Sequence, residues 1–458
     1  MAKFVDDKIE HIESDIEKIQ TKPSMYISYL GERGALHLCK ETINNAIDEC
    51  TNTNSPGDTI SILLDEGENS ISVSDNGRGI DPAMMEIICT TLQSGSKFNR
   101  DGTGGQSAGE NGVGLTCCNA LADKFEIIMT RYGERYKIGF SEGKLVEPLH
   151  CTKLKNTDKH GTTFVIVPSK KYMGPCNINS DELTTWLEKI IHLVSSSITI
   201  NLTIKKKGKE SMITRKLRNK NGLYDYIKKL CTKPSVDPAH VLATNRLKEV
   251  VHNKEYDRFI GLEFAFTYDQ SSVEFYADSF CNFVNTIDNG VHVDAVKQAI
   301  VHYFGKITRD GLSERESKKL DIIASDMTQG LVLTVYLSTD YPPMFTGQTK
   351  EKVGSNELFK PIRDMAYKAL VDYFKQNPKD SKKIVDRIKL NARARIESTR
   401  VRNSVIKGDK PNFYEHMLDN FAPANNRGKN QYKELFIIEG KSLLSLNLFN
   451  CGDALVRL

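Results

Sequence analysis

Hydrophobic positions recur at helical spacing in some stretches and at strand spacing in others, so the pattern predicts a mixed α+β protein. Isoleucines three and four residues apart predict a helix over residues 7–20, and a largely apolar face predicts another over 35–50. A further helix is expected over 180–195. Alternating or continuous apolar runs predict strands over residues 59–64, 70–74, 125–130, 135–140, 162–167 and 198–205.

The C-terminal half predicts a second α/β unit, over about residues 220–405. The pattern gives strands at 259–267, 272–277 and 331–337, and helices at 291–304, 314–325 and 355–376. A basic helix follows over about 380–407, and a last strand is expected at 433–438. A lysine run at 205–209 and a polar stretch at 219–222 indicate a boundary near residue 215.

Composition and charge exclude several classes of protein. With 458 residues, 39% hydrophobic and 27% charged, the chain is typical of a globular protein of two to four domains. No apolar run approaches the ~20 residues of a membrane-spanning helix, and no signal peptide is visible, so we expect a cytosolic protein without a membrane partner. The ten cysteines lack Cys-x-x-Cys spacing, which disfavours zinc ribbons and disulfide frameworks.

The first chemical motif is Glu41-x-x-x-Asn45-x-x-Asp48 within the predicted helix 35–50. Spacings of four and three place the three side chains on one helix face. Glu41 could deprotonate a water molecule, and Asn45 offers an oxygen to Mg²⁺. Taken alone, the motif is more typical of a solvated face of an amphipathic helix.

The second motif is a turn from Asp75 to Ile80 at the end of a predicted strand. A carboxylate held there can accept a hydrogen bond from an exocyclic amine such as that of adenine. Gly77 and Gly79 would let the backbone approach a planar ligand closely. An ordinary surface turn explains the same residues.

The third motif is Gly-Glu-Asn-Gly-Val-Gly at residues 109–114, where a helix is predicted to begin. Glycine-rich backbone at a helix start presents N–H groups to phosphate oxygens. The spacing differs from the dinucleotide-binding Gly-x-Gly-x-x-Gly, so a Rossmann fold is disfavoured. A flexible loop without a ligand remains an alternative for this motif alone.

Together, in this order and spacing, the three motifs resemble the ATPase of the GHKL superfamily, most closely the B subunit of DNA gyrase and other type IIA topoisomerases. Residues 22–27 look like the entry motif, 160–163 like the strand with an adenine-supporting threonine, and 348–350 like the transducer loop that reaches the γ-phosphate. Residues 435–440 look like the opening of a Toprim domain. The resemblance implies an α+β architecture: a GHKL (Bergerat) α/β sandwich over 1–215, a ribosomal-S5-domain-2-like transducer over 216–405 and an incomplete Toprim part over 406–458.

The resemblance also implies ATP and Mg²⁺ as cofactors and assigns roles to individual residues. Glu41 would be the general base and Lys350 the cation at the γ-phosphate. Asn45 would hold Mg²⁺ with ATP, and Glu439 is a possible Toprim metal ligand. A lid over 102–109 would close on the nucleotide. The implied ATP-binding set is Asn45, Asp48, Asp75, Arg78, Gly79, Ile80, Ser96, Lys97, Gly109, Glu110, Asn111, Gly112, Val113, Gly114, Leu115, Thr162, Gln348 and Lys350.

Two features depart from the Toprim pattern. Lys441 stands where that pattern has an acidic residue, and the sequence ends at Leu458, before the aspartate pair that would bind metal. The resemblance therefore implies either a truncated sequence or a remaining Toprim portion on a separate polypeptide.

The predicted C-terminal helix is strongly basic. Residues 382–407 carry nine basic and two acidic side chains, a local charge of +7 on a chain of net charge +4. Such a helix can contact DNA phosphates by counterion release, although a solvated charged helix is the common outcome of a charge run. The candidate DNA contacts are Lys382, Lys383, Arg387, Arg393, Arg395 and Arg400.

The resemblance thus implies the ATPase subunit of a type IIA topoisomerase, in the cytoplasm of a bacterium or a phage-infected cell. Its expected partners are double-stranded DNA, a second copy joined through the ATPase domain, and a DNA-cleaving subunit. Two alternatives remain open: another GHKL ATPase, such as a MutL-like repair protein or a chaperone, and a non-catalytic ATP-responsive clamp.

Overall fold

The computed structural model describes residues 14–27, 29–52, 54–94, 112–155, 158–209, 211–251, 254–341, 343–347, 350–406, 421–422, 435–438 and 454–457. The chain divides into two compact units. Met1–Lys306 with Met327–Ile384 form the first unit, and Ile307–Asp326 with Val385–Leu458 form the second.

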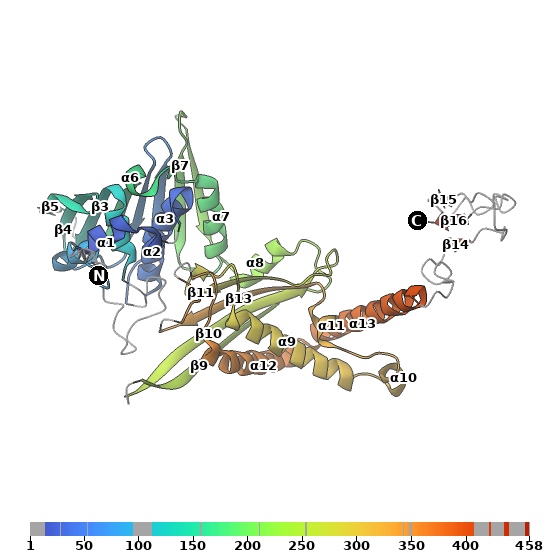
Figure 1. Ribbon diagram of the computed structural model, residues 1–458. Coiled ribbons are helices and arrows are strands. Elements are labelled where there is room, and N and C mark those ends of the chain that lie inside the picture. The colour runs from blue at the N-terminus through green and yellow to red at the C-terminus, as the bar shows by residue number, and fades with distance from the viewer. Residues whose placement is uncertain are drawn as a thin grey trace, which may run out of the picture. The chain divides into compact units, whose positions relative to one another are not determined.

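An eight-stranded sheet forms the N-terminal part of the first unit (Figure 1). Its strands are β1 (Thr59–Asp65), β2 (Ser70–Asp75), β3 (Ala122–Arg131), β4 (Glu134–Ser141), β5 (Lys144–Lys153), β6 (Gly161–Pro168), β7 (Thr199–Lys205) and β8 (Met212–Arg218). Their order is β5-β4-β3-β6-β2-β1-β7-β8, with β1 and β7 parallel and the other neighbours antiparallel. Alternate residues of β1, β2, β6 and β7 are buried, so one face of the sheet is covered and the other is more open.

Helices cover the buried face of this sheet. They are α1 (Asp15–Thr21), α2 (Ser24–Ile27), α3 (Gly31–Thr51), α4 (Ile87–Thr90), α5 (Gly114–Ala120), α6 (Lys170–Met173) and α7 (Ser180–Ile190), with a 3₁₀ turn at Pro82–Met84. Helix α3 packs on β1, β2 and β6 through fully buried residues such as Leu38, Ile43 and Ile47. Because apolar residues recur at helical spacing on one side of α3, its polar residues are left to face elsewhere.

A five-stranded sheet follows in the same unit, in the order β12-β11-β13-β10-β9. Its strands are β9 (Ala239–Val251), β10 (Lys254–Tyr268), β11 (Tyr276–Cys281), β12 (Val284–Asn285) and β13 (Leu331–Thr339). The associated helices are α8 (Leu223–Leu230), α9 (Val291–Asp310) and α12 (Phe359–Gln376), the last preceded by a 3₁₀ turn at Asn356–Leu358. Phe266 of β10 lies 6.2 Å from Phe304 of α9 and 6.3 Å from Phe374 of α12, ring centre to ring centre, so aromatic contacts join the sheet to both helices.

The remaining elements are α10 (Glu314–Ser317), α11 (Ala324–Thr328), α13 (Pro378–Ile406), β14 (Phe421–Ala422), β15 (Leu435–Ile438) and β16 (Ala454–Arg457). The three short strands pair in the order β14-β16-β15, so a strand is present where the sequence predicts the last one. Glu439, predicted as a Toprim metal ligand, and Lys441 lie outside the described residues.

Most of the predicted elements are found, and four differ. The helix predicted over 314–325 is wrong, because α10 ends at Ser317 and α11 begins at Ala324. The carboxylate of Asp326 accepts a hydrogen bond from the N–H of Ile323, which starts a new helix rather than continuing the first. The strand expected at 272–277 lies at Tyr276–Cys281, after a turn held by the side chain of Asp269. The predicted helix 180–195 ends at Ile190, and the helix predicted over 7–20 is described only from Asp15.

Among the described strands, β5, β8, β9, β12, β14 and β16 were not predicted from the sequence. Strands β5 and β8 form the two edges of the large sheet and are almost wholly exposed, so neither has the alternation that reveals a half-buried strand. The predicted boundary at residue 215 falls inside β8, which pairs with β7 through Arg218.

A buried ion pair holds the second unit together. Asp326 has a fully buried side chain and accepts hydrogen bonds from Arg395 of α13, Nε to Oδ1 at 2.8 Å and Nη2 to Oδ2 at 3.1 Å. Asn391 of the same helix donates to the backbone carbonyl of Asp326 at 3.0 Å. Arg395 therefore ties the segment Ile307–Asp326 to α13, although the sequence suggested that it contacts DNA.

We expect Arg395→Ala to destabilise the second unit by about 3 kcal/mol, because it leaves the buried carboxylate of Asp326 without its countercharge. The measurement is hydrogen exchange across residues 314–326, which should accelerate. Arg393→Ala is the matched control, since Arg393 is exposed and lies 3.5 Å from Glu316 in an ion pair of little energetic weight. Equal exchange in the two variants would contradict the structural role of Arg395.

Candidate functional site

The first unit contains a cavity of about 1000 Å³ that brings together segments far apart in the sequence. Its walls come from α3, the turn after β2, the start of α5, strand β6 and the segment at 350–351. Of the residues predicted to bind ATP, the following line it: Asn45, Asp75, Arg78, Gly79, Ile80, Gly112, Val113, Gly114, Leu115, Thr162 and Lys350. Glu41, the predicted base, also lines it.

Helix α3 presents Glu41 and Asn45 to the cavity, as the spacing predicts. One turn before the base, Nε2 of His37 lies 3.6 Å from Oε1 of Glu41. Burial lowers the pKa of His37, and the Glu41 carboxylate acts in the opposite sense. The carboxylate of Glu41 lies against the start of α5, where a Cβ on Gly114 would overlap it. The glycine therefore leaves room for the base.

Asp48, the third residue of the helical motif, is buried and does not line the cavity. It lies one turn beyond Asn45, near the C-terminal end of α3. The structure therefore brings Glu41 and Asn45 to the cavity and leaves Asp48 in the protein interior.

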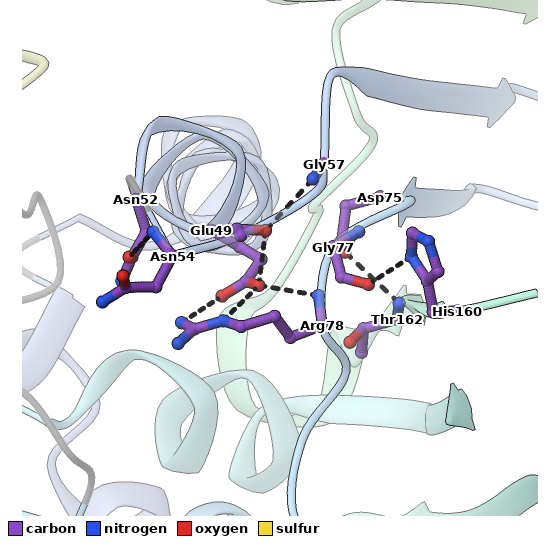
Figure 2. Close-up of polar contacts among 10 residues, drawn as sticks. Glu49, Asn52, Asn54, Gly57, Asp75, Gly77, Arg78, His160 and Thr162 are labelled. Atoms are coloured by element: carbon purple, nitrogen blue, oxygen red, sulfur yellow. Dashed lines mark hydrogen bonds and ion pairs between the residues drawn. The ribbon is translucent and has the colours of Figure 1, made fainter. Parts of the chain in front are cut away.

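The turn after β2 holds a buried carboxylate at the cavity wall (Figure 2). Asp75 is 8% exposed, and its Oδ1 accepts hydrogen bonds from the N–H of Gly77 at 2.8 Å and of Thr162 at 3.4 Å. Burial raises the pKa of Asp75 to about 6, although the Gly77 N–H acts in the opposite sense. An acceptor with little water around it suits the amine of a purine ring, which would supply the missing donor.

Gly161 and Gly79 allow this wall to close. Gly161 has φ +131°, and a Cβ on it would overlap the backbone carbonyl of Asp75, so the start of β6 can lie directly against the turn. Gly79 has φ +76°, and a Cβ on it would lie 3.1 Å from the sulfur of Met129. Nδ1 of His160 lies 2.8 Å from the carbonyl oxygen of Gly77, a hydrogen bond that fixes the turn from the other side (Figure 2).

Arg78 is held in an ion pair with Glu49 of α3, as Figure 2 shows. Its Nε donates to Oε1 of Glu49 at 3.0 Å and its Nη2 donates to Oε2 at 2.9 Å, while Ser55 donates to the same carboxylate at 2.8 Å. Burial raises the pKa of Glu49, but the hydrogen bonds from Arg78 outweigh it and hold that pKa below its usual value. The pair joins α3 to the turn and forms one side of the cavity.

The glycine-rich motif reaches the cavity at its C-terminal end. Gly112, Val113, Gly114 and Leu115 line the wall, and α5 begins at Gly114 as the sequence predicts. The other predicted phosphate and lid residues, Ser96, Lys97, Gly109, Glu110 and Asn111, lie outside the described residues, as does the predicted lid at 102–109.

Lys350 reaches the cavity from the tip of a hairpin that follows β13. The hairpin is closed by hydrogen bonds from Thr346 N–H to Lys352 at 3.0 Å and from Gly354 N–H to Met344 at 2.7 Å. Lys350 has φ +55°, and its N–H donates to the Gly347 carbonyl in the turn. Gln348, predicted to bind ATP beside it, lies outside the described residues.

Two family models match the chain. Residues 31–171 match the model of the histidine kinase-, DNA gyrase B- and HSP90-like ATPase, and residues 222–404 match the DNA gyrase B model. The gyrase B protein of Thermotoga maritima is 29% identical over 455 residues, covering 96% of this chain and 68% of the relative. The topoisomerase 4 B protein of Mycoplasma capricolum is 28% identical over 458 residues, covering 96% and 66%. These matches are to type IIA topoisomerase B subunits of the GHKL superfamily, and they support the same assignment for this chain.

Solved structures of such ATPase regions share the fold of this chain. The 43K ATPase domain of Thermus thermophilus gyrase B has a TM-score of 0.65 at 24% identity and covers 85% of this chain and 97% of that domain. The ATPase region of Saccharomyces cerevisiae topoisomerase II has a TM-score of 0.57 at 20% identity, covering 83% and 99%. The chain spans about two thirds of the length of the curated relatives it matches.

Similarity to this ATPase family implies that the protein binds ATP. The described residues include no cluster of three His, Cys, Asp or Glu that could hold a metal ion alone. Asn45 at the cavity wall fits a Mg²⁺ that is bound mainly by phosphate oxygens and water, because such ions need only one or two protein ligands. Along the described part of this chain, no helix has the length and apolar character that a membrane span requires.

The sequence reasoning missed four cavity-lining residues: His37 and Glu49, which contact Glu41 and Arg78, and Tyr29 and Glu351, which contact each other. The first is one helical turn from Glu41, so the i, i+4 spacing could have revealed it. The second is in α3, but its partner Arg78 is 29 residues away, and the last two are joined across 322 residues. No local pattern reports such contacts.

Proposed function

We propose that the chain is the ATP-binding and ATP-hydrolysing subunit of a type IIA DNA topoisomerase. The observation that supports this most directly is that Glu41, Asp75 and Lys350, from three distant segments, line one cavity. Their proposed roles are the general base, the acceptor for the adenine amine and the cation at the γ-phosphate, respectively. The curated relatives are gyrase and topoisomerase IV subunits, which favours this function over a MutL-like repair protein or a chaperone.

The proposed chemistry follows from the positions of these groups. Asp75 accepts a hydrogen bond from the adenine amine. Glu41, whose carboxylate is oriented by His37, accepts a proton from the attacking water. Gly112 and Gly114 offer backbone N–H groups to phosphate oxygens, and Lys350 supplies positive charge at the γ-phosphate. Mg²⁺ held by Asn45 would neutralise phosphate charge.

ATP binding would join two copies through their N-terminal regions and close a gate around a DNA segment. The γ-phosphate contributes contacts to Lys350 and the glycine-rich backbone that are lost after hydrolysis, so it stabilises the closed arrangement. The proposed organisation is an ATPase region, which we extend to Arg218 because β8 pairs with β7, then a transducer to about 405 and a Toprim region from 406. A DNA-cleaving subunit would complete a cytoplasmic enzyme.

DNA would contact the exposed basic residues of α13. Lys382, Lys383, Arg393 and Arg400 are exposed, and Arg387 is half-buried. Lys383 lies 3.4 Å from Asp237, and Arg400 lies 3.9 Å from Glu397, in exposed pairs that phosphates can replace at little cost. We exclude Arg395 from this set because its guanidinium is bound to a buried carboxylate. Contacts to phosphates alone would not discriminate between DNA sequences.

We expect Lys350→Ala to retain ATP binding and to lose DNA-stimulated ATP turnover, because the variant removes a charge that acts only on the γ-phosphate and not on the base or sugar. The measurement is ATP hydrolysis by the reconstituted enzyme with and without duplex DNA. Lys352→Ala is the matched control, because Lys352 is exposed on the same hairpin and does not line the cavity. Unchanged DNA stimulation in Lys350→Ala would argue against the proposed role.

A further inference from the structure

A hydrogen bond connects the segment before α3 to the hairpin that carries Lys350. The hydroxyl of Tyr29 donates to Oε1 of Glu351 at 2.8 Å, across 322 residues of sequence. Both residues line the cavity, and Glu351 is the direct neighbour of Lys350. The contact therefore joins the part of the chain that supplies the base to the part that supplies the cation.

Tyr29 is fixed relative to α3, the helix that carries Glu41. Its N–H donates to the Ile27 carbonyl at 2.6 Å. Its own carbonyl lies so close to Gly34, in the first turns of α3, that a Cβ there would be 2.6 Å away. The guanidinium of Arg33 lies 5.6 Å from the centre of the Tyr29 ring. The hydroxyl is thus presented from a segment that is fixed against the start of the base-bearing helix.

Glu351 is fixed relative to the second sheet. Its carbonyl accepts a hydrogen bond from the N–H of Asp288 at 2.9 Å. Two residues later, the N–H of Val353 donates to the Asn289 carbonyl at 3.2 Å, and the Val353 carbonyl accepts from the N–H of Val291 at 3.1 Å. A Cβ on the intervening Gly290 would overlap the backbone of Val353. The return arm of the hairpin is therefore attached to the segment before α9, and the side chain of Glu351 on this arm contacts Tyr29.

We propose that Tyr29 is a positioning residue for ATP hydrolysis: by holding Glu351, its hydroxyl sets the place at which Lys350 meets the γ-phosphate. The inference rests on the role proposed above for Lys350. Glu41 is on a helix that packs against the eight-stranded sheet, whereas Lys350 is on a hairpin that follows β13 of the five-stranded sheet. A small displacement of Lys350 relative to Glu41 would weaken stabilisation of the transition state without weakening nucleotide binding. A hydrogen bond to a charged acceptor has the strength to restrain such a displacement.

Tyr29→Phe removes the hydroxyl and keeps the ring. We expect kcat for ATP hydrolysis to fall about five- to tenfold, while the Kd of a non-hydrolysable ATP analogue changes less than about twofold. Hydrogen exchange of residues 350–353 in the analogue complex should become faster. Tyr172→Phe is the matched control, because Tyr172 donates to Glu142 at 3.1 Å and does not line the cavity. It should leave both measurements unchanged.

The acceptor side gives an independent readout. Glu351→Ala should behave like Tyr29→Phe, whereas Glu351→Gln keeps a side-chain oxygen and should restore kcat to within about twofold of wild type. In the Lys350→Ala background, Tyr29→Phe should cause no further loss, because the residue acts through Lys350.

Wild-type kcat and exchange in Tyr29→Phe would overturn the inference. So would an equal fold-loss in the wild-type and Lys350→Ala backgrounds, which would show that Tyr29 acts elsewhere. The proposed function fails separately, if Glu41→Gln hydrolyses ATP at the wild-type rate. Loss of hydrolysis in Glu41→Gln together with wild-type behaviour of Tyr29→Phe would overturn the positioning role alone.

Discussion

Glu41→Gln is expected to lower the rate of ATP hydrolysis by at least about 100-fold and to leave nucleotide binding within a few-fold of wild type. A general base contributes factors of about 10² to 10⁴, and an amide cannot accept the proton. The substitution preserves the side-chain volume against Gly114 and the contact with His37. Steady-state hydrolysis and equilibrium binding of a non-hydrolysable analogue, each with and without duplex DNA, provide the test.

Glu32→Gln is the matched control, because Glu32 is an exposed carboxylate on the same helix and does not line the cavity. It should hydrolyse ATP at the wild-type rate. If Glu41→Gln did so as well, Glu41 would not be the base. If the wild-type protein bound and dimerised with ATP but showed no turnover that depends on Glu41, the non-catalytic clamp would be the correct function.

Asp75→Asn should weaken binding of adenine nucleotides by about 10- to 100-fold, since a charged acceptor for the purine amine is worth about 1.5–3 kcal/mol. Asparagine fills the same volume, and its oxygen can still accept from the N–H groups of Gly77 and Thr162. The turn is therefore expected to stay intact. The measurement is titration calorimetry with a non-hydrolysable ATP analogue, and an affinity equal to wild type would show that adenine is not read here.

The pKa of Asp75 supplies a control for this experiment. Its value is raised by burial from 3.8 to about 6, so the folded state binds the proton more tightly than the unfolded state. The buried carboxylate consequently costs about 3 kcal/mol at pH 7, and stability attributable to this group increases as the pH falls from about 6 towards 4. Asp75→Asn should not lower the stability of the nucleotide-free protein at pH 7. The affinity of the wild-type protein for the ATP analogue should fall as the pH drops through about 6, whereas the affinity of Asp75→Asn should change less.

Local patterns predicted the parts of the site that lie close together in the sequence. The helical spacing of Glu41 and Asn45, the turn from Asp75 and the glycines at 112 and 114 each depend on backbone geometry over a few residues, and each lies at the cavity. Asp48 shows the limit of this reasoning. Helical spacing places it near Asn45, but burial of the C-terminal end of α3 separates it from the cavity.

The amphipathic helices and the alternating strands were enough to predict an α+β fold, because such signals depend on the intrinsic geometry of helices and strands. The nucleotide site was implied by the resemblance that the three motifs carry together. The pairings of Arg78 with Glu49, Arg395 with Asp326 and Tyr29 with Glu351 depend instead on which segments the packed sheets bring together. Charged and polar side chains have many chemically suitable partners in a chain of this size. Folding selects among them, so their roles became visible only in three dimensions.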